Sequence, residues 1–370
     1  MRILLIVNEF PPQQLRGTAM ATASLAQALA RRGWEVQVIV ARSEGAPSEE
    51  TVGLVRVRRL AVWNVPFTGT VQRLVRILLL ASKIRPDLVQ GQAASCGLFA
   101  VVVGWWLSIP SITYVQGMDF HEAGPLRRIL EVGPAIRYAT KTLAVSDLFA
   151  TAIRPYAAGP VQSLPHGYQP ERIAPEVEAT ARRMMSTAGP NLLFVGHLEP
   201  DKGETFLLPA VAMLAKDWPG VTLHMVGDGP LRTELEALAL RLGIASLVRF
   251  YGWLPHDTVL ALMRQVDLFV LSSVMEPFGI VVVEALNEGC PVVVTTACGS
   301  AMAVEQGRSG LVVPPADSQA LADAMRRILA DQALQESMRR AAREAGAQYG
   351  WDRIVERFER VYAELLGASR

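Results

Sequence analysis

The feature that most constrains the fold of this sequence is a regular alternation of short β-branched runs with amphipathic stretches at helical spacing. A helix is predicted at residues 17–32, and Gly33 ends it. Such βαβα alternation is typical of a parallel sheet that helices cover on both faces. In the first half of the chain, the predicted strands lie at residues 2–8, 35–41, 87–90, 111–115 and 142–145.

The alternation pauses once, in a segment rich in proline and glycine at residues 166–190, which predicts a domain boundary. It then resumes and ends in a long amphipathic helix at 351–366. The chain is therefore an α/β protein with two doubly wound, Rossmann-like domains, and ligands of two such domains are expected in a cleft where they face each other. The predicted strands of the second half lie at residues 191–195, 221–226, 247–250, 268–271, 291–295 and 311–313.

Charge divides the chain in the same way. The 370 residues are 51% hydrophobic and carry a formal net charge of +1, which does not indicate a nucleic-acid-binding protein. Residues 1–165 hold 17 Lys/Arg and 10 Asp/Glu, a net charge of +7, whereas residues 166–370 hold 19 and 25, a net charge of −6. Two interpretations stay open: the halves bind different partners, or opposite charges help two domains face each other.

Membrane and disulfide signals are weak. Three scattered cysteines are too few for a disulfide framework and indicate a reducing, cytoplasmic compartment. The start of the chain resembles a first strand rather than a signal peptide. Residues 88–118 carry no charge, but their most apolar part, 97–107, is about half of the roughly 20 residues that a membrane-spanning helix needs. A buried helix between two buried strands is the better interpretation.

Several common signatures are missing from the sequence. It has no G-x-G-x-x-G after a strand, no G-x-x-x-x-G-K-[ST], no Asp-x-Asp, no His-x-x-x-His and no Gly-x-Ser-x-Gly. These absences argue against dinucleotide binding, a phosphate loop, a tightly held metal and a serine nucleophile. We therefore expect no cofactor and no metal.

The most specific segment is Glu276-Pro-Phe-Gly-Ile-Val-Val-Val-Glu284, which follows a predicted strand. Gly279 opens a helix, and a helix start offers backbone N–H groups and a positive dipole end to a phosphate or to hydroxyl groups. Glu284 lies about one turn further along. Taken alone, the two glutamates are also explained as solvated residues at a helix end.

Two other segments end predicted strands. Gly196-His-Leu-Glu-Pro-Asp-Lys-Gly203 follows the predicted strand 191–195 and contains one cation, Lys202. In Val226-Gly-Asp-Gly-Pro230, Gly227 and Gly229 allow close approach of the backbone to a ligand, and the proline starts a helix.

These segments, in this order, resemble the retaining GT-B-fold glycosyltransferases of family four (glycosyl transferases group 1). The resemblance runs over essentially the whole chain and is strongest in residues 191–315. It implies an acceptor-binding domain at 1–168, a nucleotide-sugar-binding domain at 169–350 and a C-terminal helix at 351–370 that crosses back to the first domain. It implies that Lys202 binds the diphosphate, that Glu276 contacts the donor sugar and that Glu284 holds the ribose hydroxyls. Further donor contacts are implied for Gly17, His197, Gly227, Gly229, Phe278, Gly279 and Ile280.

The sequence departs from the pattern of the family at three of these places. Arg16 replaces the first residue of a Gly-Gly pair, and Gly17 matches the second. We leave open whether Arg16 narrows the conformations of this loop or adds a cation to the phosphate site. Gln116 replaces a histidine near the reacting sugar in a segment that includes Asp119, so it can donate a hydrogen bond but cannot carry a proton. His197 replaces an arginine, and we leave open whether it touches phosphate or packs at the strand end. Arg16 and Asp119 are assigned to the acceptor side.

The resemblance implies metal-independent, retaining transfer of a hexose from a nucleotide-diphosphate sugar to a glycan, lipid or small-molecule acceptor. A UDP-sugar is favoured and GDP-mannose stays open. The proposed catalytic residues are Lys202, Glu276 and Gln116. The alternatives are a non-catalytic nucleotide-sugar-binding protein and a nucleotide-sugar epimerase. Residues 70–83 form a basic amphipathic segment, interpreted either as a buried helix with solvated arginines or as a peripheral contact with an anionic membrane at its inner face.

Overall fold

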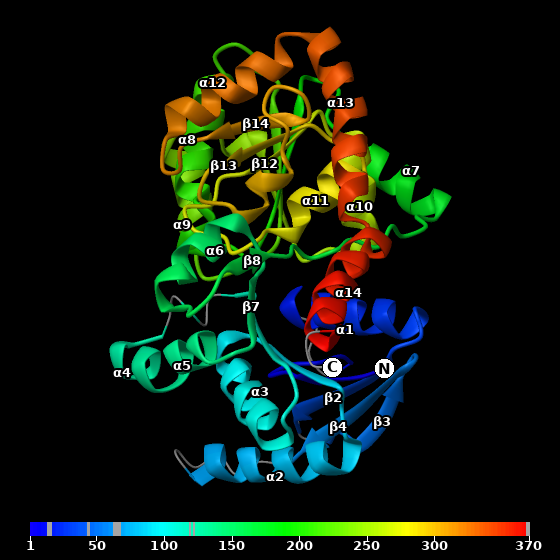
Figure 1. Ribbon diagram of the computed structural model, residues 1–370. Helices are drawn as coiled ribbons and strands as arrows, with labels where there is room; N and C mark the ends of the chain where they lie inside the picture. Colours follow the sequence, from blue (N-terminus) through cyan, green and yellow to red (C-terminus); the bar gives the residue numbers. More distant parts are fainter. Residues whose placement is uncertain (13–16, 43–44, 62–67, 118–119, 121–122, 368–370) are drawn as a thin grey trace. The chain divides into compact units, whose positions relative to one another are not determined.

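The computed structural model describes the chain except residues 13–16, 43–44, 62–67, 118–119, 121–122 and 368–370 (Figure 1). It divides into two compact units. Unit 1 comprises Met1–Gly167 together with Trp351–Arg370, and unit 2 comprises Tyr168–Gly350. Each unit has its own largely parallel sheet, which confirms the prediction of two Rossmann-like α/β domains. Among the described residues, none of the helices combines the length and hydropathy that crossing a bilayer requires.

Unit 1 is built on an eight-stranded sheet in the order β3-β4-β2-β1-β5-β6-β7-β8, parallel except for the pair β3–β4. Its strands are β1 Arg2–Ile6, β2 Glu35–Ala41, β3 Glu49–Val52, β4 Val55–Leu60, β5 Leu88–Gln92, β6 Ser111–Val115, β7 Lys141–Ala144 and β8 Val161–Ser163. Its helices are α1 Gly17–Arg31, α2 Thr68–Ile84, α3 Ala94–Leu107, α4 Pro125–Arg127, the π turn η2 Arg128–Val132, α5 Gly133–Arg137, α6 Asp147–Ile153, the 3₁₀ turn η3 Arg154–Tyr156 and α14 Trp351–Gly367.

The sequence analysis did not predict the hairpin β3–β4 or the short strand β8. The sequence of β4, Val-Arg-Val-Arg-Arg-Leu, alternates valine with arginine over its first four residues, and β3 is a half-exposed edge of the sheet. Neither β3 nor β4 has the continuous apolar run by which buried parallel strands are recognised in a sequence.

The charge-free stretch forms helix α3 between β5 and β6, as predicted. A Cβ at Gly97 would lie 2.4 Å from Thr113 Oγ1, and one at Gly104 would lie 2.8 Å from Ser111 Cβ, so the helix packs directly on the sheet. The prediction of burial is wrong for the last turn, because Trp105 and Trp106 are 63% and 66% exposed.

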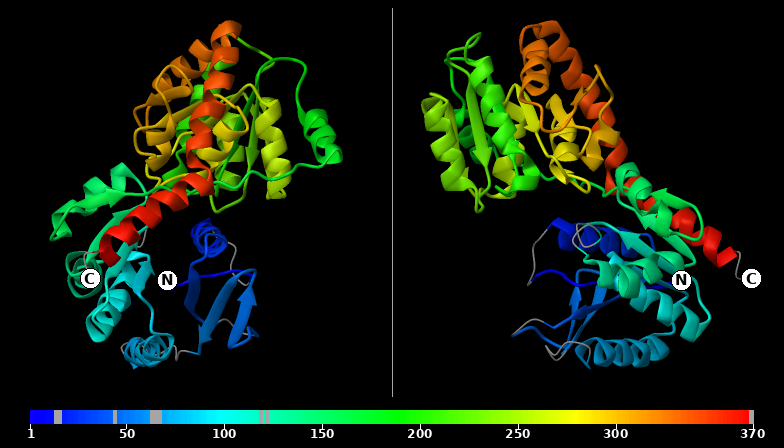
Figure 2. Two further views of the ribbon diagram at one scale, coloured as in Figure 1. Left: turned by 45° about the vertical axis from the view of Figure 1, so that its right-hand side comes forward. Right: turned by 90° about the vertical axis from the view of Figure 1, so that its left-hand side faces the viewer.

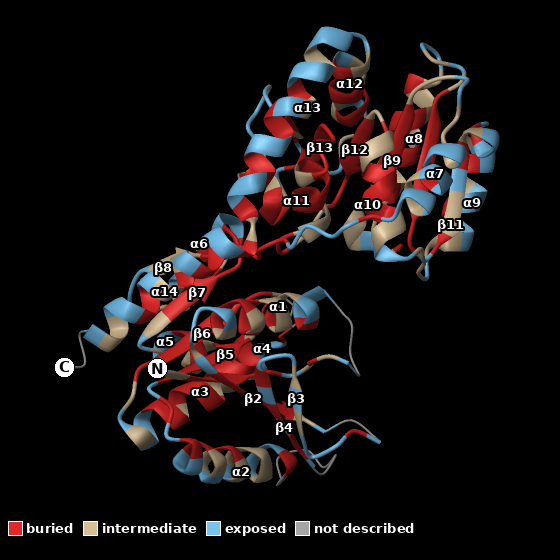
Figure 3. Cartoon of the chain, turned by 90° about the vertical axis from the view of Figure 1, so that its right-hand side faces the viewer, coloured by how far each residue is buried: buried red, intermediate tan, exposed pale blue. Residues whose placement is uncertain are grey.

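Unit 2 has a six-stranded, fully parallel sheet in the order β11-β10-β9-β12-β13-β14. Figure 2 shows it from two further sides, and Figure 3 shows its strands as the buried centre of the unit. The strands are β9 Asn191–Val195, β10 Thr222–Val226, β11 Val248–Gly252, β12 Leu268–Leu271, β13 Val292–Thr295 and β14 Gly310–Val313. The α-helices are α7 Pro175–Met184, α8 Glu204–Leu214, α9 Arg232–Arg241, α10 His256–Gln265, α11 Ile280–Asn287, α12 Ser318–Leu329 and α13 Gln332–Gly346. The 3₁₀ turns are η4 Pro200–Lys202, η5 Ala245–Leu247, η6 Gly299–Ala303 and η7 Ala347–Tyr349.

The final helix α14 packs within unit 1, although it follows unit 2 in the sequence. The Glu359 carboxylate accepts hydrogen bonds from Arg32 Nε (2.6 Å) and Trp34 Nε1 (2.9 Å). The buried Tyr362 hydroxyl donates to Gln90 Oε1 on β5 (2.8 Å). Apolar side chains on one face of α14, including Phe358, complete the contact.

Candidate functional site

The loop that leads into α11 is held in place by its own backbone. Glu276 N–H donates to Ala297 O (3.0 Å), and Gly299 N–H donates to Glu276 O (2.9 Å). Gly279 has φ of +80°, and a Cβ there would lie 3.0 Å from Cys298 Sγ, so glycine is required. The loop therefore presents Glu276 and Phe278 directly before the positive end of the α11 dipole.

Lys202 and Glu276 are 74 positions apart in the sequence and meet at the carboxyl ends of neighbouring strands β9 and β12. Lys202 Nζ lies 2.9 Å from Glu276 Oε2 and 3.1 Å from Asp201 Oδ2. Burial disfavours the ammonium, but the two carboxylates outweigh it and raise the pKa of Lys202 above its ordinary value. The lysine is thus a fixed cation. Asp201 belongs to this cluster but was not selected from the sequence.

Glu204 follows Lys202 closely and starts α8, yet its side chain is fully buried. Burial raises the pKa of its carboxyl group to about 7. A carboxyl group at this position is therefore half protonated near neutral pH, close to the Lys202 cluster.

Replacing Glu204 by glutamine is expected to stabilise the protein above pH 7. The folded pKa of about 7 exceeds the unfolded value near 4.5, so the wild type loses stability as pH rises between these values. The gain should be absent below pH 4.5 and reach about 1–3 kcal/mol above pH 7. Urea unfolding at pH 4.5 and pH 8 measures it, with exposed Glu234→Gln as the matched control. A gain of equal size at both pH values would contradict the assignment.

Two glycines in the loop after β10 are required because this loop packs closely on the loop after β9. A Cβ at Gly227, where φ is +126°, would lie 1.8 Å from Gly196 O, and one at Gly229 would lie 2.4 Å from Leu198 O. His197 lies in the loop after β9, and its side chain is half exposed. Its Nδ1 lies 3.1 Å from Glu199 Oε1, and its ring centroid lies 5.7 Å from that of Trp253.

Glu284 is buried on α11 and is paired with a residue that the sequence analysis missed. His256 begins α10, and its Nε2 lies 3.1 Å from Glu284 Oε1, while its Nδ1 lies 3.2 Å from Glu171 Oε1. The hydrogen bond to Glu284 raises the pKa of His256 to about 9. A lone histidine outside every motif gives no sequence signal for such a contact.

Replacing His256 by glutamine is expected to cost stability only at lower pH. The folded pKa of about 9 exceeds the unfolded value of 6.5, so the stabilisation is fully present below pH 6.5 and is lost as pH rises through 9. The side chain is 45% exposed, so we expect less than about 1 kcal/mol. Thermal midpoints of both proteins at pH 6 and pH 9.5 measure the difference, and a difference that grows with pH would contradict this account.

In unit 1, a pocket of about 240 Å³ lies at the carboxyl ends of β1, β5 and β6, beside the first turn of α1. The buried Gln116 amide donates to Gln92 Oε1, while Gln116 Oε1 has no hydrogen-bond partner within the described part of the chain. Ala93 also lines the pocket and has φ of +150°, a conformation that non-glycine residues rarely adopt. The lining residues are Val7, Asn8, Glu9, Thr18, Ala19, Thr22, Gln92, Ala93, Gln116 and Gly117.

Of the other site residues predicted in the first domain, the structure describes only Gly17. Gly17 is the first residue of α1, next to this pocket, and a Cβ there would meet open space. Arg16 and Asp119 lie outside the described residues. Asn8 and Gln92 were not selected from the sequence, although Asn8 ends the predicted strand 2–8 and Gln92 lies two residues after the predicted strand 87–90.

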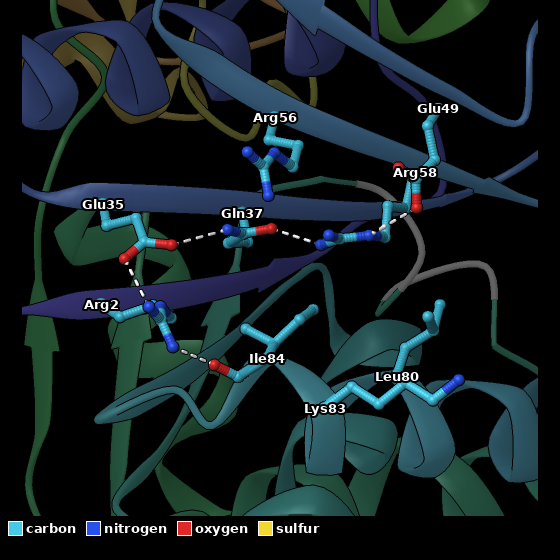
Figure 4. A pocket seen from close by; sticks show the side chains of 9 residues that line it. All are labelled: Arg2, Glu35, Gln37, Glu49, Arg56, Arg58, Leu80, Lys83 and Ile84. Atoms are coloured by element: carbon cyan, nitrogen blue, oxygen red, sulfur yellow. Dashed lines mark hydrogen bonds and ion pairs between the residues drawn. The ribbon is translucent and has the colours of Figure 1, made fainter.

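A second pocket, of about 290 Å³, lies at the opposite, amino-terminal ends of β1 and β2 (Figure 4). Its charges are largely paired: Arg2 with Glu35 (2.7 Å) and Arg58 with Glu49 (2.9 Å). Since ligands of parallel α/β sheets bind at the carboxyl ends of strands, this pocket is not part of the candidate site. Within the described residues, no cluster of His, Cys, Asp and Glu has the composition of a metal site.

Comparison with known proteins identifies the family of the chain. Residues 186–345 match the model for "Glycosyl transferases group 1", and residues 15–172 match the model for "Glycosyltransferase Family 4". The chain is 27% identical to glycogen synthase of Mycobacterium tuberculosis, over 100% of this chain and 95% of that protein. It is 30% identical to D-inositol 3-phosphate glycosyltransferase of Saccharomonospora viridis, over 66% of this chain and 60% of that protein.

Solved structures show the same fold. Sucrose-phosphate synthase of Thermosynechococcus elongatus superposes with a TM-score of 0.80 at 24% identity, covering 99% of each chain. Anabaena HepE in complex with UDP-glucose superposes with a TM-score of 0.79 at 21% identity, covering 99% of this chain and 100% of that chain.

Proposed function

Because this chain belongs to the group 1 glycosyltransferases with a GT-B fold, we propose that it transfers a hexose from a UDP-sugar, with retention of the anomeric configuration. The observation that carries the proposal is the Lys202–Glu276 pair (2.9 Å), fixed before the first turn of α11. A similar protein, HepE, was crystallised with UDP and with UDP-glucose, which favours UDP over GDP as the donor nucleotide.

In the proposed reaction, the Lys202 ammonium neutralises the charge that grows on the leaving diphosphate. Glu276 contacts the donor sugar, and the loop at Phe278, Gly279 and Ile280 approaches the donor with its backbone. Glu284 accepts hydrogen bonds from the ribose hydroxyls. The protein then acts by positioning and charge stabilisation rather than through a covalent intermediate.

Retention follows if the acceptor hydroxyl attacks on the face that the diphosphate leaves. The C–O bond to the diphosphate breaks, the bond to the acceptor oxygen forms on the same face, and the diphosphate oxygen takes the acceptor proton. Gln116 is proposed to lie near the reacting sugar, where its unpaired Oε1 accepts a hydrogen bond from a sugar hydroxyl. We propose that no bound metal is needed, because Lys202 provides the positive charge.

The acceptor is proposed to be a glycan, a lipid or a small molecule bound by unit 1. Contact of this basic unit with an anionic membrane belongs to the same proposal, since it would bring the site to lipid acceptors.

The test is release of free nucleotide diphosphate from UDP-glucose, UDP-N-acetylglucosamine, UDP-galactose and GDP-mannose, with EDTA present. Release from a UDP-sugar that Lys202→Ala and Glu276→Ala both abolish supports the proposal. Release from GDP-mannose alone would overturn the choice of donor, and donor isomerisation without release would indicate an epimerase. Thermal stabilisation by a donor with no turnover, across a panel of lipid and sugar acceptors, would indicate a non-catalytic binder.

A further inference from the structure

Unit 1 exposes an unusual amount of apolar surface on three helical segments. Among the described residues, fifteen large hydrophobic side chains are exposed, and nine of them lie on α2, on the end of α3 and within 125–138. Unit 2, of similar size, exposes only two such side chains in its described residues, Leu240 and Trp253. The nine are Val71, Val75, Leu79, Trp105, Trp106, Leu126, Ile129, Leu130 and Tyr138. Contiguous exposed apolar surface of this kind marks an interaction site.

Six of these residues form one band, which we call the tryptophan face: Val71, Val75, Leu79, Trp105, Trp106 and Tyr138. Val71, Val75 and Leu79 are spaced four apart along α2 and so share one side of that helix. Ser82, three positions further, accepts a hydrogen bond from Trp106 Nε1 (3.2 Å). The adjacent Trp105 ring meets the Tyr138 ring edge to face, with centroids 5.7 Å apart. Figure 1 shows α3 running between α2 and α5, and it packs against both helices.

The tryptophan face lies in strongly basic surroundings. The helices α2 and α3 and residues 125–138 together carry six Lys/Arg and one acidic residue, Glu131, which is paired with Arg127 (3.0 Å). Lys83 and Arg137 are exposed beside the face. Arg73, which the sequence analysis counted with this segment, turns inward instead, because its guanidinium donates to Val7 O (2.9 Å) and Asn8 Oδ1 (3.2 Å). The positive charge therefore comes from the remaining cations.

From this geometry we propose that the tryptophan face rests on an anionic lipid bilayer. Tryptophan and tyrosine rings bind at the level of the headgroups, aliphatic side chains reach the acyl boundary, and Lys/Arg attract anionic lipids. A partner protein or a second copy of this chain would need an acidic surface of matching shape, whereas an anionic bilayer needs none. The test below includes this alternative as one of its outcomes. The inference deepens the membrane contact proposed above and rests on that proposal only for the lipid nature of the acceptor.

The experiment is co-sedimentation of the full-length protein with vesicles of phosphatidylcholine, with and without phosphatidylglycerol. We expect binding to the anionic vesicles and its reversal by salt. Lys83→Glu and Arg137→Glu should each weaken it about fivefold or more, and Trp105→Glu with Trp106→Glu should weaken it at least about tenfold. Leu240→Glu, an equally exposed apolar residue of unit 2, is the matched control and should bind as the wild type does.

Cooperative thermal unfolding, measured without vesicles and without donor, verifies that each variant is folded. The proposal is overturned if the wild type does not bind, if neutral vesicles bind equally well, or if Leu240→Glu loses as much binding as the tryptophan variant. It is also overturned if the tryptophan variant leaves vesicle binding intact and instead changes the oligomeric state in sedimentation analysis. Because the assay contains no sugar donor, failure here is distinguishable from failure of the transferase proposal.

Discussion

Replacing Lys202 by alanine is expected to lower kcat for release of the nucleotide diphosphate by about 10²- to 10³-fold. Lys202 is a fixed cation with Nζ 2.9 Å from Glu276 and 3.1 Å from Asp201. A charge that acts on the leaving group acts mainly in the transition state, so its loss lowers kcat and kcat/KM together. Steady-state kinetics on the best donor measures both constants.

A matched control separates this effect from a general loss of positive charge. Lys216→Ala removes an exposed lysine of the same unit and should leave kcat unchanged. Removing Lys202 also leaves Glu276 without its cation, so Glu276→Gln combined with Lys202→Ala tests whether the remaining carboxylate repels the donor. A rise in KM alone after Lys202→Ala would mean that the lysine only binds the ground state and would contradict the proposed role.

The strands were the most predictable part of the fold. Four predicted ranges, 35–41, 111–115, 191–195 and 268–271, agree with the observed strands because buried parallel strands form continuous apolar runs. The hairpin β3–β4 was missed because Val55–Leu60 mixes valine with arginine and its partner β3 is a half-exposed edge strand. Trp105 and Trp106 were assigned to a buried helix because hydropathy does not show where a helix leaves the core.

The site was predictable only where motifs end neighbouring strands. Lys202 and Glu276 follow β9 and β12, which pair directly, so the carboxyl ends of these strands bring the two residues together. The contact between His256 and Glu284 depends instead on how α10 packs beside α11, and no spacing in the sequence encodes that. The burial of Glu204 was likewise unpredictable, because a charged residue at a helix start is usually solvated.

Replacing Glu284 by alanine is expected to raise KM for the donor by about 10- to 100-fold and to leave kcat nearly unchanged. Hydrogen bonds to a charged acceptor contribute roughly 1.5–3 kcal/mol, and the ribose lies far from the breaking bond, so the contact is equally strong in ground and transition states. Initial rates across donor concentrations measure both constants.

The pairing of Glu284 with His256 predicts that a change at His256 also alters KM for the donor. In the described structure, Glu284 Oε1 already accepts from His256 Nε2 (3.1 Å), so the imidazole orients the carboxylate or competes with the ribose for it. His256→Gln distinguishes these, since KM rises if the histidine orients Glu284 and falls if it competes. Exposed Glu234→Ala is the control and should change neither constant. A loss of kcat in Glu284→Ala at unchanged KM would place this carboxylate at the reacting sugar instead of at the ribose.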